Sequence, residues 1–298
     1  TWLQNLFNFL ALSLLRLFAF LPYTITVHVG YGLGWLAAHI PNGRSKVVKT
    51  NLRLCFPNLS EQELDELAIE HWKLFGRSVV ERSRVWLGTS NQILSFVRLE
   101  SNVPLGDRKP RILVNPHFVG LEGGFMALSA LAMKNGWPRG AGLYQKMKNP
   151  FFNQKMVEWR DRFGAKSIER QSRLRDLIRE TRDGNFVVIA PDIDLGPRDS
   201  IFVPFFNIPT STVTSVSRLA KLSGAEVCLM TTFLNVDKSG YTCNISSPLE
   251  EFPSDDPDQD TARLNQYIEE LVRERPAEYY WVHKRFKHRP AGEPSLYD

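Results

Sequence analysis

The first forty residues form the most apolar part of the chain. From Trp2 to Leu21, fifteen of twenty positions are apolar, and no acidic residue occurs before Glu61. Twenty helical residues span about 30 Å, which is roughly the thickness of the hydrocarbon core of a bilayer. Arg16 stands near one end of this segment, where its side chain can reach the interface. The pattern predicts that residues 1–22 form a transmembrane or interfacial anchor.

A second apolar segment, from Tyr23 to Ile40, is rich in glycine. It predicts another helix, packed either on a membrane surface or on the rest of the protein. Its run Gly32-Leu-Gly34-Trp-Leu-Ala37 resembles a nucleotide-binding glycine pattern, but it has no strand before it, so close helix packing explains it better. The basic residues that follow place the rest of the chain in the cytoplasm by the positive-inside rule. They are Arg44, Lys46, Lys49 and Arg53. A buried helical hairpin in a soluble protein is the alternative for residues 1–40.

Beyond residue 60 the chain alternates between helical and strand patterns. Ser60 and Glu63 form a capping-box sequence before apolar residues at helical spacing. We expect further helices at 121–133, 150–163, 172–182, 212–222 and 260–273, and strands at 111–114, 186–190, 227–234 and 241–245. This alternation predicts an α/β fold with a mixed central sheet flanked by helices, over a single domain at 23–298.

Composition excludes several classes of protein. Of 298 residues, 43% are hydrophobic and 23% charged, which is ordinary for a packed globular chain. Three cysteines without a CxxC pair argue against a disulfide scaffold or a zinc ribbon. The net charge of +5 is weak evidence for anionic partners. Nucleic-acid binding is not favoured, because the basic residues are scattered and no recognised module is present.

The sharpest chemical pattern is a histidine directly after a predicted strand. His117 follows the strand at 111–114, and Glu122 stands five residues later in the first turn of the next expected helix. Ligands of α/β proteins bind at this edge of a sheet. A carboxylate that holds one imidazole nitrogen leaves the other free to accept a proton from a hydroxyl. Without further context, a structural histidine explains the pair equally well.

Two more polar segments are expected at the same edge. Arg160 and Arg162 stand near the end of one helix, and Asp192 and Asp194 lie in the turn after the strand at 186–190. Taken singly, the arginines fit a solvated helix face and the aspartates fit a turn that caps its own backbone. Three clusters at one edge favour a binding or catalytic site.

These motifs resemble the bacterial lipid A late acyltransferases, the lauroyl and myristoyl transferases of the wider lysophospholipid acyltransferase-like superfamily. The resemblance covers nearly the whole chain. It includes Asn51-Leu-Arg-Leu-Cys-Phe-Pro57, Pro116-His117-Phe-Val-Gly-Leu-Glu122, Asn149-Pro150, Arg160-Asp-Arg162, Ala190-Pro-Asp192-Ile-Asp194-Leu-Gly196, Ser200-Ile-Phe-Val-Pro-Phe-Phe206 and Trp281-Val-His283-Lys-Arg285-Phe-Lys287-His-Arg289-Pro290. It implies a glycerolipid acyltransferase-like fold with an N-terminal membrane-anchoring helix.

The resemblance also implies a reaction. A fatty acyl group passes from acyl carrier protein to a hydroxyl of a 3-hydroxyacyl chain on the lipid A precursor, giving an acyloxyacyl ester. His117 is then the general base and Glu122 the carboxylate that orients it. No metal and no cofactor are implied, because the thioester donor is already activated.

Further roles follow from the same resemblance. Arg160 and Arg162 are expected to face phosphates of the lipid or of the donor, since a guanidinium matches phosphate geometry. Asp192 and Asp194 are expected to shape the rim and hold such arginines. Arg285 belongs to a basic cluster, 283–289, that is expected to contact lipid phosphates or the acidic carrier protein, with a solvated tail as the alternative.

The resemblance places the protein at the bacterial inner membrane, in contact with phospholipid, with its catalytic domain on the cytoplasmic face. Two other hypotheses remain open from the sequence. One keeps the chemistry and changes the acceptor to another lysolipid or hydroxylated lipid. The other is a basic peripheral lipid-binding protein without catalysis.

Overall fold

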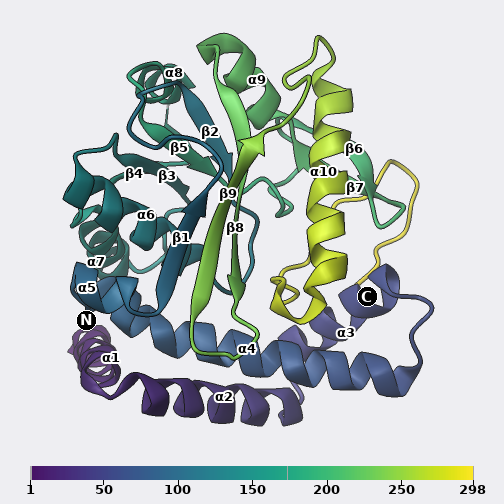
Figure 1. The fold of residues 1–298 in the computed structure, drawn as a ribbon. Helices are drawn as coiled ribbons and strands as arrows, with labels where there is room; N and C mark the ends of the chain where they lie inside the picture. Colours follow the sequence, from purple (N-terminus) through teal and green to yellow (C-terminus); the bar gives the residue numbers. More distant parts are fainter. Residues whose placement is uncertain (1, 173, 298) are drawn as a thin grey trace.

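A seven-stranded sheet forms the centre of the protein in the computed structural model, which describes residues 2–172 and 174–297 (Figure 1). In spatial order its strands are β1 (Val97–Ser101), β9 (Tyr241–Pro248), β8 (Glu226–Leu234), β2 (Arg111–Val114), β5 (Phe186–Ile189), β3 (Gly140–Tyr144) and β4 (Lys166–Glu169). The β8–β9 pair is antiparallel, and the other neighbours are parallel. The expected mixed sheet is confirmed. A separate antiparallel hairpin consists of β6 (Ser200–Phe205) and β7 (Ile208–Val213).

Helices cover both faces of this sheet, so its central strands are buried on both sides. Side chains alternate along β2 and β5 between the two faces. Leu113, Phe186 and Val188 pack with α6 (Leu121–Asn135). Ile112, Val114, Val187 and Ile189 pack instead with α8 (Leu174–Arg182), α9 (Ser215–Ser223) and α10 (Pro257–Glu274). This explains why the sequence shows continuous apolar runs at 112–114 and 186–189.

One long helix, α4 (Glu61–Leu87), runs along the base of the domain (Figure 1). It begins at the expected capping box, in which Ser60 and Glu63 each accept from the other's backbone N–H. Shorter helices lie around it: α3 (Gly43–Cys55), α5 (Ser90–Leu94), α7 (Pro150–Asp161) and the 3₁₀ turn η1 (Pro276–Glu278). The Asn149 side chain caps α7, as its sequence predicts.

The glycine-rich helix α2 (Tyr23–His39) packs directly against α4. A Cβ atom added at Gly34 would lie 2.1 Å from the Trp72 carbonyl oxygen, and one at Gly30 would lie 2.5 Å from the Arg77 Cα. Gly32 faces away, because nothing lies within 4 Å of its added Cβ. Close helix packing therefore explains the pattern at Gly34. The opposite face of α2 exposes large apolar side chains, namely Ile25, Leu33, Trp35 and Leu36.

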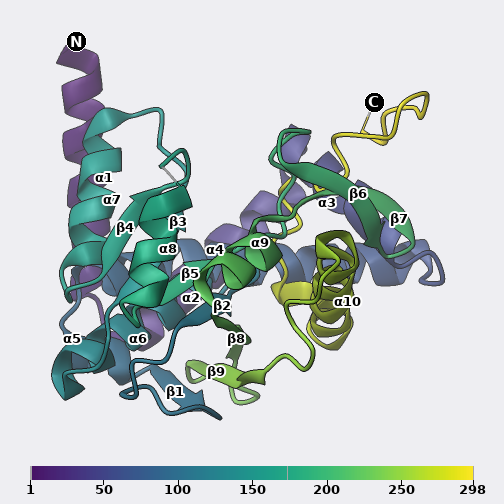
Figure 2. The same cartoon turned by 90° about the horizontal axis from the view of Figure 1, so that it is seen from above.

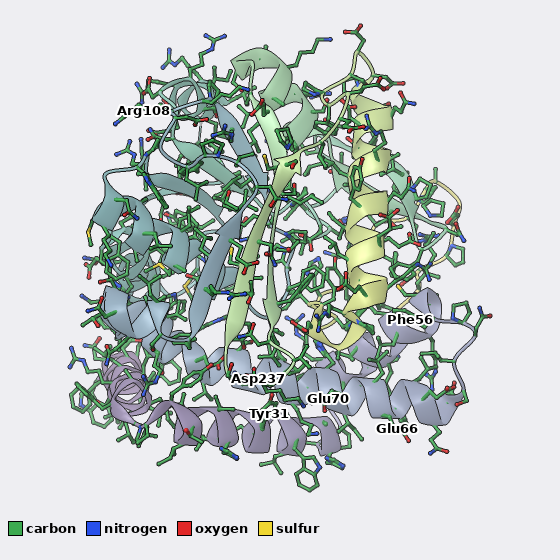
Figure 3. The ribbon with its side chains drawn as sticks, in the orientation of Figure 1. Tyr31, Phe56, Glu66, Glu70, Arg108 and Asp237 are labelled. Atoms are coloured by element: carbon green, nitrogen blue, oxygen red, sulfur yellow. The ribbon has the colours of Figure 1, made fainter. Side chains whose placement is uncertain are left out.

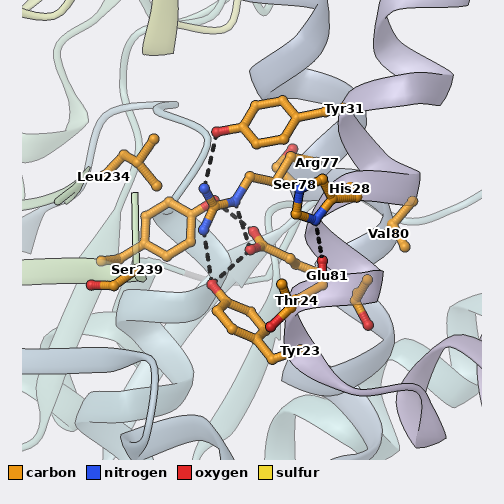
Figure 4. A network of polar contacts seen from close by, with 12 residues as sticks. Tyr23, Thr24, His28, Tyr31, Arg77, Ser78, Val80, Glu81, Leu234 and Ser239 are labelled. Atoms are coloured by element: carbon orange, nitrogen blue, oxygen red, sulfur yellow. Dashed lines mark hydrogen bonds and ion pairs between the residues drawn. The ribbon is translucent and has the colours of Figure 1, made fainter. Parts of the chain in front are cut away.

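A buried polar network joins α2, α4 and β9 (Figure 4). The Arg77 guanidinium donates to Glu81, at 2.8 Å, and to the hydroxyls of Tyr23 and Tyr31. Tyr23 and Tyr241 each donate a hydroxyl hydrogen bond to Glu81, at 2.8 and 2.6 Å. The Arg77 side chain is fully buried, and its charge is matched by that of Glu81. Such a satisfied network fixes the position of α2 on the domain.

The β8–β9 turn reaches the same two helices. Lys238 Nζ lies 3.4 Å from the Glu70 carboxylate on α4 and 5.8 Å from the centre of the Tyr31 ring on α2. Figure 3 labels Asp237 in this turn, Glu70 on α4 and Tyr31 on α2. The antiparallel pair is therefore tied to the helical base.

The apolar helix α1 (Trp2–Phe20) stands at the edge of the molecule, and its N-terminal turns project past α7 (Figure 2). It is long and apolar enough to cross a membrane by length and composition. Most of its side chains are exposed, but Asn8 is buried, and its Oδ1 accepts from Asn149 Nδ2 at 2.8 Å. A break at residues 21–22 separates α1 from α2.

The expected helices and strands are present, with shifted ends. The helix expected at 212–222 begins at Ser215, because residues 208–213 belong to β7. The helix expected from residue 172 is described from Leu174, and residue 173 lies outside the described residues. The sequence pattern did not predict β1, β3, β4 or the β6–β7 hairpin. Strands β3 and β4 are short, and β3 contains two glycines, so they lack a strong apolar pattern.

Candidate active site

Two neighbouring strands bring His117 and Asp192 together. Val114 at the end of β2 pairs in parallel register with Ile189 at the end of β5, and His117 and Asp192 each follow three residues later. One Asp192 oxygen accepts from His117 Nδ1 at 2.8 Å, and the other accepts from its backbone N–H at 2.8 Å. Since a carboxylate only accepts, the proton of the neutral imidazole lies on Nδ1, and Nε2 carries the lone pair.

The surroundings favour a charged Asp192 beside a partly open imidazole. Burial alone raises the pKa of the Asp192 carboxyl, but the charge and hydrogen bonds of His117 bring it below its usual value. Asp192 is 1% exposed, whereas the His117 side chain is 26% exposed. The Tyr280 ring lies beside the imidazole, with centroids 5.8 Å apart. His117 therefore has a fixed orientation and an Nε2 able to accept a proton.

Glu122 does not contact the imidazole as expected. Its two oxygens accept from Arg160 Nε at 2.7 Å and Nη2 at 2.5 Å, and Trp86 Nε1 donates to it at 2.8 Å. Burial alone raises the pKa of the Glu122 carboxyl, but Arg160 and Trp86 bring it below its usual value. The expected Glu122–His117 contact is thus wrong. The register of β2 and β5 explains this, because it places Asp192 beside His117, while Glu122 pairs with Arg160 instead.

Arg162 does not present its guanidinium to a substrate phosphate. Its Nη1 donates to the Gly88 carbonyl and its Nη2 to the Val85 carbonyl, at 2.9 Å for the latter. These carbonyls end α4 and have no further helical partners, so Arg162 caps that helix. Burial lowers the pKa of Arg162 to about 10. We correct the expected phosphate-binding role of Arg162 to a structural one.

Arg285 is also structural. It is 2% exposed and donates to the Ser211 carbonyl at 2.8 Å and to Thr212 Oγ1 at 2.9 Å. These bonds fasten the C-terminal segment to β7. The expected substrate contact of Arg285 is wrong, because the guanidinium is used inside the protein.

Asp194 repeats the arrangement of Asp192 with another histidine. Its two oxygens accept from the backbone N–H of His288 at 2.7 Å and from its Nδ1 at 2.6 Å. The expectation that Asp192 and Asp194 hold arginines is corrected, since both hold histidines. Asp194 also donates its backbone N–H to His283 Nε2 at 3.1 Å.

The turn at 192–194 thus holds three histidines, His117, His283 and His288, and of these the sequence pattern indicated His117 alone. His283 and His288 were grouped with a basic cluster, and their roles depend on a fold-back of the C-terminal segment that local pattern does not reveal. Of the expected arginines, Arg160 is the one that pairs with another expected site residue, Glu122. Within residues 2–172 and 174–297, no group of three or more His, Cys, Asp or Glu side chains is placed to hold a metal ion.

A histidine that is held by a buried carboxylate at the edge of an α/β sheet, with its second nitrogen free to accept a proton, is an arrangement suited to general-base chemistry. Residues 2–288 match the family model described as bacterial lipid A biosynthesis acyltransferase. The chain therefore belongs to this family and is an acyltransferase of lipid A biosynthesis.

Curated relatives agree with this assignment. The chain is 33% identical to a lipid A biosynthesis acyltransferase of Haemophilus influenzae over 296 residues, which covers 97% of this chain and 93% of the relative. It is 31% identical to the lipid A biosynthesis lauroyltransferase of Escherichia coli over 299 residues, covering 97% and 94%. The palmitoleoyltransferase of the same organism is also 31% identical over 299 residues, covering 96% and 92%.

Among solved structures, the 1-acyl-sn-glycerophosphate acyltransferase of Thermotoga maritima is 14% identical, and the alignment covers 78% of this chain and 94% of that one. The TM-score of 0.35 is too low for a detailed comparison of the two molecules.

Proposed function

We propose that this protein transfers a fatty acyl chain from acyl carrier protein to a hydroxyl of a 3-hydroxyacyl chain on the lipid A precursor, forming an acyloxyacyl ester. The observation that carries the proposal is the pair of hydrogen bonds from His117 to Asp192, which leaves Nε2 unprotonated. Family membership supplies the acyl group and the lipid A context.

In this reaction His117 Nε2 removes the proton of the acceptor hydroxyl as its oxygen attacks the thioester carbonyl carbon. As this bond forms, the π electron pair of the thioester C=O moves onto its oxygen. When the pair returns, the C–S bond breaks, and the departing thiolate takes the proton from His117. Asp192 stabilises the transient imidazolium and fixes its orientation. Holding hydroxyl and thioester together supplies much of the rate enhancement.

In the proposed reaction, Glu122 and Arg160 form a pair that binds an anionic group of a substrate. Two nitrogens of Arg160 are engaged by Glu122, and Nη1 has no hydrogen-bond partner within the described ranges. The Arg160 side chain is 18% exposed. We assign to Glu122 the orientation of Arg160, and to Arg160 a contact with an anionic group of the donor or the lipid.

The test uses the purified protein with lauroyl-acyl carrier protein and the tetra-acylated lipid A precursor. We expect one lauroyl ester to be added, detected by mass spectrometry, with no added metal or cofactor. Absence of transfer to this precursor, with transfer to lysophosphatidic acid instead, overturns the lipid A acceptor in favour of another lysolipid. No transfer to either acceptor favours a lipid-binding protein without catalysis.

We also propose that α1 anchors the protein in the bacterial inner membrane, in contact with phospholipid, with the catalytic domain on the cytoplasmic face. The exposed leucines of α1 support this, because Leu10, Leu14 and Leu17 each keep more than half of their surface exposed. Leu10→Glu with Leu14→Glu is expected to abolish flotation with phospholipid vesicles. Leu222→Glu, at an exposed leucine of α9, is the control and is expected to float as the wild type does. Unchanged flotation of the α1 variant overturns the anchor.

A further inference from the structure

The tautomer of His283 is fixed by its surroundings. Its Nε2 accepts a hydrogen bond from the backbone N–H of Asp194 at 3.1 Å. A backbone N–H can only donate, so Nε2 carries the lone pair and the ring proton lies on Nδ1. Within the described part of the chain, Nδ1 has no hydrogen-bond partner, and it is not among the buried polar atoms that lack one. His283 therefore presents an unused N–H donor at an accessible position.

This imidazole stays neutral at physiological pH. A second proton, on Nε2, would remove the hydrogen bond with Asp194. Burial, followed by the charges of His117 and Arg285, lowers the pKa of His283 to about 4. A neutral imidazole N–H can donate a hydrogen bond that polarises a substrate oxygen.

His283 and His117, the proposed base, are held by the same turn, since Asp192 bonds to His117 and the Asp194 backbone N–H bonds to His283. The Tyr280 ring is 5.8 Å from the His117 ring, centroid to centroid, and the His283 backbone N–H donates to the Tyr280 carbonyl at 3.4 Å. The two imidazoles interact through charge, since positive charge on His117 disfavours protonation of His283. The donor and the proposed base thus belong to one site.

Hydrogen bonds hold both the backbone and the ring of His283 in place. Asn51 Nδ2 donates to the carbonyls of Trp281 and His283, each at 2.8 Å. Asp194, whose N–H contacts the ring, is itself held by His288 and by the backbone N–H of Gly196 at 3.0 Å. A donor held in place before the reaction begins costs little reorganisation when charge develops near it.

We infer that His283 Nδ1–H donates a hydrogen bond to the oxyanion of the tetrahedral intermediate. This inference rests on the proposed function. As the hydroxyl oxygen bonds to the thioester carbon, the C=O π pair moves onto oxygen, and His283 stabilises that charge without giving up its proton. The proton of the hydroxyl goes to His117, and the thiolate takes it when the C–S bond breaks. Asp194 is a positioning residue that acts through His283.

Two substitutions separate this role from a structural one. In His283→Asn the amide nitrogen can take the place of Nδ1, so the donor remains while the contact to Asp194 is lost. In His283→Gln the amide oxygen can take the place of Nε2, so the Asp194 contact remains while the Nδ1 donor is lost. Each variant is assayed as the full chain with lauroyl-acyl carrier protein and the tetra-acylated precursor, and thermal unfolding checks that it is folded. Lys134→Gln, an exposed residue at the far end of α6, is the control.

We expect His283→Gln to lower kcat by about 10²–10³, as loss of one oxyanion donor does, with KM nearly unchanged. His283→Asn is expected to keep kcat within about tenfold of the wild type. If both variants lose kcat equally, or if His283→Gln is more active than His283→Asn, then the Asp194 contact is what matters and the inference is overturned. Wild-type activity in His283→Gln also overturns it. By contrast, a wild-type protein that transfers no acyl group contradicts the proposed function itself.

Discussion

Asp192 holds His117 at two points, because its two oxygens accept from the backbone N–H and from Nδ1 of the same residue, each at 2.8 Å. One contact fixes the backbone position and the other fixes the tautomer. The pair links the ends of two adjacent parallel strands, so its geometry is as rigid as the sheet.

Asp192→Asn is expected to lower kcat by about 10²–10⁴, because an amide can donate to Nδ1 and thereby place the proton on Nε2. KM is expected to change much less. Steady-state acyl transfer measures both constants, and Asp183→Asn, at an exposed residue, is the control. A kcat equal to that of the wild type would contradict the role of Asp192.

Glu122→Ala is expected to destabilise the fold as well as reduce turnover. Glu122 is 8% exposed and paired with Arg160, so its removal leaves a buried guanidinium without a counter-charge, at a cost of about 3–5 kcal/mol. Glu122→Gln with Arg160→Met removes both charges and is expected to recover most of this stability but not the activity. Chemical unfolding gives the free energies, and stability of the single variant equal to the wild type would argue against the pair.

Arg162→Ala is expected to lower stability by about 1–3 kcal/mol, because two carbonyls at the end of α4 lose their charged donor. The KM for acyl carrier protein thioester is expected to stay unchanged. Thermal unfolding and steady-state kinetics check the two expectations. A large rise in KM with unchanged stability would restore the phosphate-binding role that the sequence suggests.

Gly34→Ala and Gly32→Ala form a matched pair on one helix. At Gly34 the added Cβ lies 2.1 Å from the Trp72 carbonyl oxygen, so α2 must shift from α4, at a cost of about 1–3 kcal/mol. At Gly32 nothing lies within 4 Å, and alanine is expected to stabilise the helix by about 0.5–1 kcal/mol. Urea unfolding of both variants tests the α2–α4 contact, and similar effects at the two positions would refute it.

His71 gives the folded protein a defined pH dependence. It is fully buried, and burial lowers its pKa to about 4, from an ordinary value of 6.5. Below pH 6.5 the unfolded chain therefore binds a proton that the folded chain does not, so stability falls as the pH decreases from 6.5 to 4. The shift corresponds to about 3 kcal/mol. His71→Gln is expected to lose this part of the dependence when unfolding is measured across that range, and an unchanged pH profile would contradict it.

Local sequence was enough to predict the elements with strong patterns. The capping box at Ser60, the proline-started helix α7 and the doubly buried strands β2 and β5 were all predicted correctly, since each depends on residues adjacent in the chain. Strands β3 and β4 were missed. They are held in the sheet by neighbouring strands rather than by their own composition.

The candidate site divides in the same way. Placement of His117 and Asp192 at one sheet edge follows from two strands and the turns after them, which the sequence shows. The hydrogen-bond partner of each charged group cannot be read from the sequence. The five-residue spacing between His117 and Glu122 says nothing about the register between β2 and β5, and that register decides the partner. Arg162 and Arg285 show the same difficulty, since a buried arginine and a phosphate-binding one look alike in sequence.

The sequence by itself determined the family, the α/β class, the apolar N-terminal helix and the histidine at the strand end, all of which depend on composition and local order. The tertiary structure alone decided that Asp192 rather than Glu122 contacts His117, and that Asp194 holds His283, whose Nδ1 has no hydrogen-bond partner within residues 2–172 and 174–297. The physical reason is that hydrogen-bond partners depend on strand register and on the return of the C-terminal segment. Both are set by packing between residues far apart in the chain.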